Sequence, residues 1–453
     1  MDFPINKNDD LELTITGLNS EGAGVARHLG VAVFVKTTVV GETVRAHIIK
    51  VNKNYAIGKL MGITKVSKDR VTPLCSEYFK CGGCSLQHIV YEKQLEFKRD
   101  MVSDALLHIG GNDCQVLPTL PIDAPIRFRN KASFPFSIID GRAHFGFFAE
   151  RSHRLIPIND CVCVSEIAVK IAKTVTEFLN DRQISIYDEE TKRGVVRHVV
   201  IRTNEKEEAQ VTIVSTVPIR HKDELIERLL NEVPSILGII NNINKKETNM
   251  ILGNEYQLLY GELTFPYEIM GMKFRVHPAS FLQVNHAQTV KLYSTAIEYL
   301  GAGEDDIVFD VYSGIGTMSL LLAKSVKKVI GIENIKEAVE NSVENAKLNG
   351  VQNAEFVCEA AETALPRLIK EGIIPNGVIL DPPRRGCEGA VIDALIASGT
   401  KRIVYVSCRP GTLARDIKLF IDGGFEVKKV QPVDMFGYSA HVETVVLLSH
   451  KNS

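Results

Sequence analysis

VFDVYSGIGTMSLLLAKSVKKVIGIEN, residues Val308–Asn334, is the stretch that decides the fold of the C-terminal part of the chain. A short apolar run leads to Gly314 and Gly316, then to an apolar segment with helical spacing, and then to a second β-branched run. Glycines permit a tight turn and let the backbone approach a ligand at the start of a helix. The pattern predicts a strand, a glycine-containing loop, a helix and a second strand.

Strand and helix patterns continue to alternate from Met272 to the C-terminus. This alternation predicts a doubly wound, Rossmann-like α/β domain, in which ligands bind at the carboxyl ends of the strands. The residues that follow each predicted strand are therefore the candidates for a functional site.

The glycine-containing loop favours a ligand without a pyrophosphate. A dinucleotide fingerprint would place a third glycine where the chain has Ser319. Glu333 ends the second predicted strand, and a carboxylate there can accept hydrogen bonds from both hydroxyls of a ribose. The alternative is that Glu333 only caps the following helix. We interpret the pattern as a site for a single nucleoside such as S-adenosylmethionine.

Two later strand ends carry reactive groups. Asp381 precedes two prolines, which hold the chain extended, so its carboxylate is expected to project into the cleft. Enzymes that methylate exocyclic amines have an aromatic residue after Asp-Pro-Pro, and this chain has Arg384 there. Cys408 follows the apolar run KRIVYVS and precedes a turn. Taken alone, a cysteine at a strand end is more often a small apolar filler than a nucleophile.

The composition, 45% hydrophobic and 24% charged residues, is that of a soluble globular protein. A chain of 453 residues is too long for one core. The net charge of -2 means that any nucleic-acid contact must come from local basic patches. Neither a signal peptide nor an apolar run of about 18 residues is present, so a cytoplasmic location without membrane contact is expected.

Nine cysteines in such a chain indicate metal binding or catalysis instead of disulfides. Cys75, Cys81 and Cys84 lie close together in sequence, and Cys161 and Cys163 form a second group. Four thiolates can bind zinc or a [4Fe–4S] cluster. The spacing differs from the Cys-x3-Cys-x2-Cys of enzymes that cleave S-adenosylmethionine by radical chemistry, so a radical mechanism is not expected.

The segments before the α/β domain carry two basic stretches. Short alternating strands with glycines at their breaks, over residues 11–63, predict a small β-barrel of the OB type. Seven Lys or Arg residues and one acid lie within residues 45–70. A mixed α+β pattern covers residues 126–267, where phenylalanines interleave with cations. Such stretches suit contact with unpaired RNA bases, and a solvated strand face is the alternative.

Nine features in the same order resemble the RNA uridine-C5 methyltransferase family, and specifically its iron–sulfur members that act on 23S ribosomal RNA. They are a TRAM-like barrel and the segments PLCSEYFKCGGCSLQH, RFRNKASFPF, FLQVN, DVYSGIGTMSL, IENIKEAVENSVENAKLN, DPPRRG, SCRPGTLARD and DMFGYSAHVE. The resemblance spans nearly the whole chain. One departure is that Gly437 and Ser439 stand where the family usually has a proline and a further threonine before the final glutamate.

The resemblance implies a role for residues in these segments. Cys408 would be the nucleophile, and Glu443 the base that abstracts a proton. The contacts to S-adenosylmethionine would be Gln283, Tyr312, Gly314, Glu333 and Asp381. The ligands of a [4Fe–4S] cluster would be Cys75, Cys81, Cys84 and Cys161, with Cys163 as the alternative to Cys161. With a nucleoside site and an acid on the same sheet, the nucleophile becomes the better interpretation of Cys408.

The chemistry explains why these residue types are needed. A thiolate that adds to carbon-6 of uracil raises the electron density on carbon-5 and can later be expelled. A free thiol has a pKa of about 8.5, so the site should supply positive potential. Arg409 and the helix starting near Thr412 are the expected sources. Asp381 is expected to contact uracil N3–H as well, which would help to distinguish uracil from cytosine.

The sequence therefore predicts a TRAM barrel (1–64), a cysteine-rich segment (65–92), a helical segment packing on the catalytic domain (93–124), a central α+β RNA-binding domain (125–268) and an α/β methyltransferase domain (269–453). The expected partner is an unpaired loop uridine of 23S ribosomal RNA, bound by a monomer.

Three alternatives stay open. The same chemistry on transfer RNA is disfavoured because that branch of the family generally lacks both barrel and cysteine cluster. The others are an enzyme that methylates exocyclic amines without a covalent step and a non-catalytic RNA-binding or ribosome-assembly factor.

Overall fold

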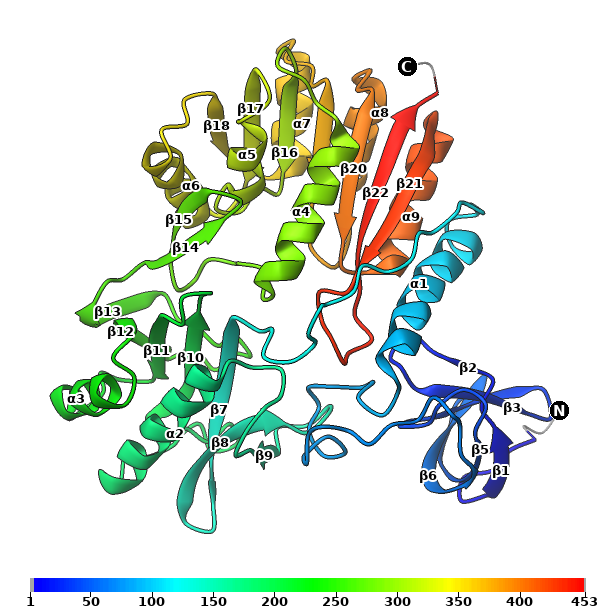
Figure 1. Cartoon of the computed structure of the whole chain (residues 1–453), viewed down its shortest axis with the longest axis vertical. Helices are drawn as coiled ribbons and strands as arrows, with labels where there is room; N and C mark the ends of the chain where they lie inside the picture. The colour runs from blue at the N-terminus through cyan, green and yellow to red at the C-terminus, as the bar shows by residue number, and fades with distance from the viewer. Residues whose placement is uncertain (1–3, 452–453) are drawn as a thin grey trace.

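The computed structural model describes residues 4–451, so the expected outer limits at residues 1 and 453 lie outside the described residues. The chain forms a barrel-like N-terminal unit, a central sheet with its helices, and a C-terminal α/β unit (Figure 1). Over residues 4–451, no helix combines the length and the apolar character that a membrane crossing requires.

The N-terminal sheet has the strand order β1-β5-β6-β4-β3-β2. Its strands are β1 (Asp10–Thr14), β2 (Gly17–Leu18), β3 (Gly24–His28), β4 (Val31–Val35), β5 (Thr43–Val51) and β6 (Tyr55–Lys65). Alternate side chains, such as Val44, Ala46 and Ile48 of β5, are buried in one small core. The period of two seen in the sequence therefore corresponds to one inward-facing side of these strands.

Helix α1 (Tyr91–His108) follows the cysteine-rich loop and packs on α9 (Pro410–Asp422) of the C-terminal unit (Figure 1). Its residues Val102 and Leu106 belong to the same core as Leu413 of α9. The helix thus joins the N-terminal region to the α/β unit through a shared apolar contact.

The central sheet has the order β13-β12-β11-β10-β7-β8-β9. Its elements are β7 (Lys131–Ile139), β8 (Arg142–Phe148), β9 (Leu155–Pro157), α2 (Glu166–Asp181), β10 (Val196–Thr203), β11 (Ala209–Ser215), α3 (Lys222–Glu232), β12 (Ile236–Ile243) and β13 (Glu255–Gly261). Every residue of β10 and β11 is buried, since these strands lie in the middle of the sheet. Both helices contribute to the core of this unit.

The C-terminal sheet has the order β18-β17-β16-β19-β20-β22-β21. Its strands are β16 (Ile307–Val311), β17 (Lys328–Glu333), β18 (Ala354–Cys358), β19 (Gly377–Leu380), β20 (Arg402–Ser407), β21 (Phe425–Val433) and β22 (Glu443–His450). Strands β16 to β20 pair in parallel, whereas β22 is antiparallel to both of its neighbours. The strand order changes direction between β16 and β19, which is where α/β sheets bind ligands.

Apolar layers cover both faces of this sheet. The remaining elements are the hairpin β14 (Phe265–Ile269) and β15 (Met272–Val276), and the helices α4 (His286–Leu300), α5 (Thr317–Leu322), α6 (Lys336–Leu348), α7 (Ala361–Lys370) and α8 (Gly389–Ala397). Val308 belongs to the core that the sheet forms with the hairpin and α4 to α6. The next residue, Phe309, points to the opposite face and belongs to the core formed with α1 and α7 to α9. The hairpin packs with the α/β unit, so a boundary between residues 268 and 269 would divide β14.

Candidate active site

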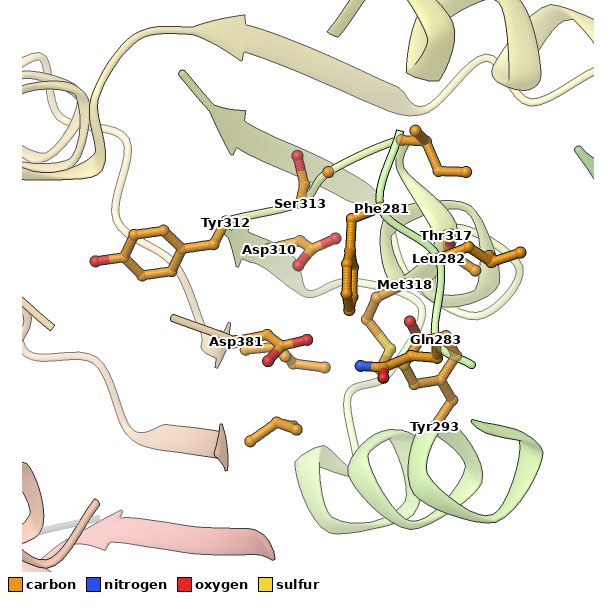
Figure 2. A pocket seen from close by; sticks show the side chains of 14 residues that line it. Phe281, Leu282, Gln283, Tyr293, Asp310, Tyr312, Ser313, Thr317, Met318 and Asp381 are labelled. Carbon is orange, nitrogen blue, oxygen red and sulfur yellow. The ribbon is translucent and has the colours of Figure 1, made fainter. Parts of the chain in front are cut away.

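A cavity lies at the carboxyl ends of β16 and β19, at the point where the strand order reverses. Four of the predicted cofactor residues line it: Gln283, Tyr312, Gly314 and Asp381. In Figure 2 the Gln283 amide and the carboxyl groups of Asp310 and Asp381 face the same space, while the Tyr312 ring extends away from them. The cavity therefore offers hydrogen-bonding groups of the kind that hold a nucleoside.

The glycine-containing loop forms one wall of this cavity. Gly316 has a φ of +80°, and a Cβ atom there would lie 2.9 Å from the Phe356 ring and 3.0 Å from Ser342. Any other residue would be strained and would also clash, so the close approach of loop and α6 requires glycine at this position.

Gln283 is held in place by the central sheet. Asn130, which immediately precedes β7, donates its side-chain amide to the Gln283 carbonyl at 3.0 Å and its backbone N–H to the Val284 carbonyl at 2.8 Å. Arg202 of β10 donates to the carbonyls of Pro278 and Ser280. The segment that carries Gln283 is thus anchored to the predicted RNA-binding unit.

Glu333, the fifth predicted cofactor residue, is not among the residues that line the cavity. Its Oε2 accepts a hydrogen bond from the Gly314 N–H at 3.0 Å, and its Oε1 accepts from the N–H groups of Asn334 at 2.8 Å and Ile335 at 2.9 Å. The carboxylate is therefore engaged by backbone N–H groups of the residues just before α6, whose first helical residue is Lys336. It also holds the loop that lines the cavity.

Three carboxyl groups extend from the cavity to the sheet edge: Asp310 and Glu443 are buried, and Asp381 is half-buried. Burial raises the pKa of Asp310 to about 6 and that of Asp381 to about 7, to which the neighbouring Asp310 charge adds. The pKa of Glu443 rises to about 8, first through burial and then through Asp381, and Arg384 opposes the rise. The Ser319 hydroxyl donates to Asp310 at 2.5 Å, which favours the charged form of that group. Protonated and ionised forms of these acids thus coexist near neutral pH.

Cys408 does not line this cavity but a groove of about 1000 Å³ between the barrel, α1 and the C-terminal sheet. Arg384, Arg409 and His441 line the same groove. The volume is ample for a nucleotide. The predicted nucleophile is therefore half-buried and open to a cleft.

The electrostatic surroundings of the thiol differ from the prediction. Burial raises the pKa of Cys408, and the carboxyl groups of Glu443 and Asp381 raise it further, whereas Arg384 lowers it. In the sequence, Arg384 only marks a departure from the amine-methylating pattern. Arg409, one of the expected sources, is the N-cap residue of α9, which starts at Pro410, two residues before Thr412 and so close to the expected start.

A buried carboxylate holds the loop that carries Arg384. Asp416 accepts hydrogen bonds from the Cys387 N–H at 2.8 Å and from the Tyr405 hydroxyl at 2.6 Å. The Thr412 hydroxyl donates to the Arg384 carbonyl at 3.3 Å. These contacts hold the backbone of the loop against β20 and α9, while the Arg384 side chain itself is exposed.

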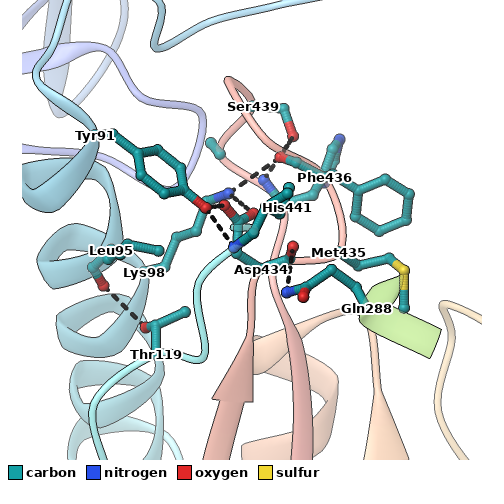
Figure 3. A network of polar contacts seen from close by, with 12 residues as sticks. Tyr91, Leu95, Lys98, Thr119, Gln288, Asp434, Met435, Phe436, Ser439 and His441 are labelled. Atoms are coloured by element: carbon teal, nitrogen blue, oxygen red, sulfur yellow. Dashed lines mark hydrogen bonds and ion pairs between the residues drawn. The ribbon is translucent and has the colours of Figure 1, made fainter. Parts of the chain in front are cut away.

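The loop of residues 434–442, which we call the base loop, connects β21 to β22 and ends at Glu443. Figure 3 shows its anchor: Asp434 is buried against Lys98 of α1, and the Tyr91 hydroxyl donates to Asp434 at 2.7 Å. The Lys98 ammonium group also donates to the Phe436 carbonyl at 3.1 Å. These contacts fix the beginning of the base loop.

Gly437 and Ser439, the two residues that depart from the family pattern, lie within the base loop. The Ser439 hydroxyl donates to the Phe436 carbonyl at 2.9 Å. A Cβ atom on Gly437 would lie 3.0 Å from Ile122. The side chains present in this chain therefore suit a tightly packed loop.

The five cysteines of the two groups interact electrostatically. Burial raises the pKa of Cys75 and Cys81, and each is affected by the charges of Cys84 and Cys161. Cys84 Sγ lies 3.7 Å from Cys163 Sγ, and a hydrogen bond from Cys163 lowers the pKa of Cys84 and of Cys161. All nine cysteines are free thiols.

This donor chemistry fits a thiolate-bound cluster. Within the part of the chain that the structure describes, however, no three or more His, Cys, Asp or Glu side chains are placed to hold a metal ion.

The cavity contains residues that sequence reasoning missed. Tyr293 of α4 lines it beside Gln283 (Figure 2), and its pKa is raised by burial and then by Asp381. Asp310 had a usable signal, because an acid inside the apolar run VFDV is unexpected in a buried strand. No local pattern distinguishes Tyr293 from an ordinary core residue.

The chain matches two family models. Residues 90–451 match the model described as tRNA (Uracil-5-)-methyltransferase, and residues 6–61 match the TRAM domain. Curated relatives named "Uncharacterized RNA methyltransferase" include one from Clostridium tetani, 42% identical over 99% of this chain and 98% of its own. Another, from Clostridium acetobutylicum, is 44% identical over 98% of each chain.

A solved structure is similar over almost the whole chain. It is the Pyrococcus abyssi tRNA (uracil-54, C5)-methyltransferase in complex with S-adenosyl-L-homocysteine, with a TM-score of 0.77 and 25% identity over 97% of this chain and 100% of that chain. The arrangement of N-terminal barrel, central sheet and α/β unit is thus shared with an enzyme crystallised with the demethylated cofactor.

Proposed function

We propose a substrate and a covalent step for this chain, which belongs to the tRNA (uracil-5-)-methyltransferase family. In this proposal it methylates carbon-5 of an unpaired uridine in 23S ribosomal RNA through a transient bond to Cys408. The protein is an S-adenosylmethionine-dependent RNA uracil-5-methyltransferase with a TRAM domain. The target RNA and the covalent step are the proposal.

The observation that carries the covalent step is the grouping of Cys408, Glu443 and Asp381. The charges of both carboxyl groups act on the pKa of the thiol, and Arg384 acts on both Cys408 and Glu443. A nucleophile, an acid–base group and a stabilising cation are therefore near one another at a single sheet edge, which is what addition and elimination at one ring require.

The proposed steps balance as follows. The Cys408 thiolate adds to carbon-6, and the electron pair of the C5=C6 bond moves into an enolate. Carbon-5 then accepts the methyl group from S-adenosylmethionine, whose methyl–sulfur bond breaks and leaves S-adenosylhomocysteine. The Glu443 carboxylate removes the proton from carbon-5, the C5=C6 bond forms again, and Cys408 leaves as a thiolate. One proton is released for each methyl group transferred.

Two RNA classes compete as substrates. The cysteine groups and their order in the chain support ribosomal RNA, through the resemblance to the iron–sulfur branch. The barrel does not separate the two, because the Pyrococcus abyssi enzyme named for transfer RNA aligns with 97% of this chain. Transfer RNA is therefore the second candidate.

Mapping 5-methyluridine in the ribosomal and transfer RNA of a strain that lacks the gene decides between them. Loss of the modification from 23S ribosomal RNA alone supports the proposal, and loss from transfer RNA alone contradicts it. For the covalent step, Glu443→Gln should trap a protein–RNA adduct that resists denaturant, and Cys408→Ala should abolish both adduct and methylation. A Cys408→Ala variant with full activity would instead support amine methylation without a covalent step.

We also propose that Cys75, Cys81, Cys84 and Cys161 hold a [4Fe–4S] cluster with a structural or RNA-positioning role, with Cys163 as the alternative to Cys161. The support is the set of free, interacting thiols contributed by the cysteine-rich loop and the segment before α2. Anaerobic purification followed by iron and sulfide analysis and visible absorbance tests it. Colourless protein with stoichiometric zinc would refute it.

A further inference from the structure

We infer that Ser85 is a positioning residue for Glu443, acting through the base loop. The inference rests on the proposed covalent mechanism, because it concerns the step in which Glu443 removes a proton. It assigns a role in catalysis to a serine of the cysteine-rich loop, far from Glu443 in sequence.

Ser85 contacts the second half of the base loop through main chain and side chain. The N–H groups of Ser85 and Leu86 both donate to the Tyr438 carbonyl, each at 2.9 Å. The Ser85 Oγ accepts a hydrogen bond from the Ala440 N–H at 3.1 Å. Three hydrogen bonds thus reach residues 438–440 from one short segment.

The backbone of the base loop needs such support. Tyr438 has a φ of +61°, in the left-handed region that non-glycine residues rarely adopt. A residue of this kind stays in place when its surroundings hold it. Among residues 4–451, the hydrogen bonds that reach residues 438–440 from outside the base loop come from Ser85 and Leu86.

The two halves of the base loop have separate anchors. Lys98 and Tyr91 of α1 hold Asp434 at its beginning, and Gln288 of α4 donates to the Asp434 carbonyl at 3.0 Å (Figure 3). None of these contacts involves residues 438–440. Removing the Ser85 hydroxyl should therefore loosen the half that leads directly into Glu443 and leave the other half anchored.

The position of this half matters for the reaction. Ala440, His441 and Val442 line the groove beside Cys408, and Glu443 follows immediately. The cofactor cavity is lined by other segments, including Gln283 and Asp381. A shift of the base loop should therefore slow proton removal and release of the adduct, while binding of the methyl donor is preserved.

The test compares Ser85→Ala with Ser76→Ala, which removes a serine hydroxyl from an exposed position of the same loop, next to Cys75. With the full-length protein and target RNA, Ser85→Ala should raise the denaturant-resistant adduct and lower turnover by about five- to tenfold, the effect of one lost hydrogen bond. Ser76→Ala should behave as the wild type. Ser85→Thr keeps the hydroxyl and should restore turnover.

Two further measurements distinguish this positioning role from a general loss of folded structure. The thermal shift produced by S-adenosylmethionine and the metal content should be the same in Ser85→Ala and Ser76→Ala. Equal adduct and turnover in these two variants would overturn the inference, as would joint loss of adduct and cofactor binding in Ser85→Ala. Glu443→Gln serves as the reference. If this variant traps no adduct, the covalent mechanism is wrong. If it traps an adduct and Ser85→Ala does not, the covalent mechanism stands and only the role of Ser85 is rejected.

Discussion

Ser407, the last residue of β20, pairs with Thr444, the second residue of β22. Cys408 and Glu443 are each one residue beyond this pair, at the edge where β16, β19 and β20 end. Opposed residues of antiparallel strands have Cα atoms about 4.5–5.5 Å apart and side chains on the same face. The reversed direction of β22 thus brings an acid from its first residue to a thiol that follows a parallel strand.

The rate should rise with pH through the neutral range. Glu443 has a pKa raised to about 8, and the pKa of Cys408 is also raised, while both groups must lose a proton before they act. We expect kcat/KM to increase between about pH 6 and pH 9, with an apparent pKa that belongs to the coupled groups. A profile that is flat or falls over this range would contradict the assignment of both roles.

Replacing Arg384 should lower kcat/KM near neutral pH more than replacing its neighbour Arg385. Arg384→Met removes the cation that lowers the pKa of Cys408, so the rate near neutral pH should fall by about tenfold for each unit by which the thiol pKa rises. Activity should recover as the pH is raised. Arg385, whose side chain is 70% exposed and paired with Glu388, is the matched control. Equal losses in the two variants, measured as pH profiles of kcat/KM, would rule out a specific role for Arg384.

Asp381→Asn should relax the choice of base. An asparagine amide can donate a hydrogen bond where a carboxylate only accepts, so a cytosine N3 becomes an acceptable partner. The ratio of uridine to cytidine methylation in matched RNA oligonucleotides should fall. Unchanged discrimination would mean that another residue selects uracil.

Glu443→Gln should stabilise the protein at alkaline pH. The folded protein holds a proton on Glu443 that the unfolded chain has already released, so the free energy of unfolding falls as the pH rises from the ordinary value of 4.5 to about 8. The neutral amide removes this fall. Denaturant unfolding above about pH 8 should show a more stable variant, with a smaller difference in acid. Substitution of the exposed Glu340 should leave the pH dependence unchanged.

Lys98→Met should destabilise the fold strongly. Both side chains of the Lys98–Asp434 pair are fully buried, and removal of one partner from such a pair costs about 3–5 kcal/mol of unfolding free energy. Replacing Asp434 by leucine in the same chain should recover part of the loss. Lys93→Met, on the solvent side of α1, should leave the unfolding free energy unchanged. Equal midpoints for Lys93→Met and Lys98→Met would show that the pair is not needed for stability.

The units of the fold were predictable where local periodicity is strong. The TRAM domain and the C-terminal methyltransferase fold were expected and are confirmed. The reversal of β22 was not, because an apolar strand pattern such as that of Glu443–His450 is the same in either direction. Its direction is set by the short connection from β21, which allows only an antiparallel neighbour.

The chemistry of the site was less accessible than its residues. In α/β sheets, ligands bind at the carboxyl ends of the parallel strands. This rule explains why Tyr312, Gly314 and Asp381 line one cavity, since each follows such a strand. It could not identify Arg384 as the cation that acts on Cys408, because that depends on how two loops from different strands pack. It also could not show that Glu333 is engaged by backbone N–H groups.

The contact between Lys98 and Asp434 joins residues 336 positions apart. During synthesis on the ribosome, α1 is made long before Asp434. Lys98 therefore lacks its ion-pair partner until the chain has reached residue 434. Contacts of such long range slow folding. Glu443, the proposed base, lies beyond Asp434 in the chain, so the Lys98–Asp434 pair and the anchored base loop can form only after these residues have been synthesised.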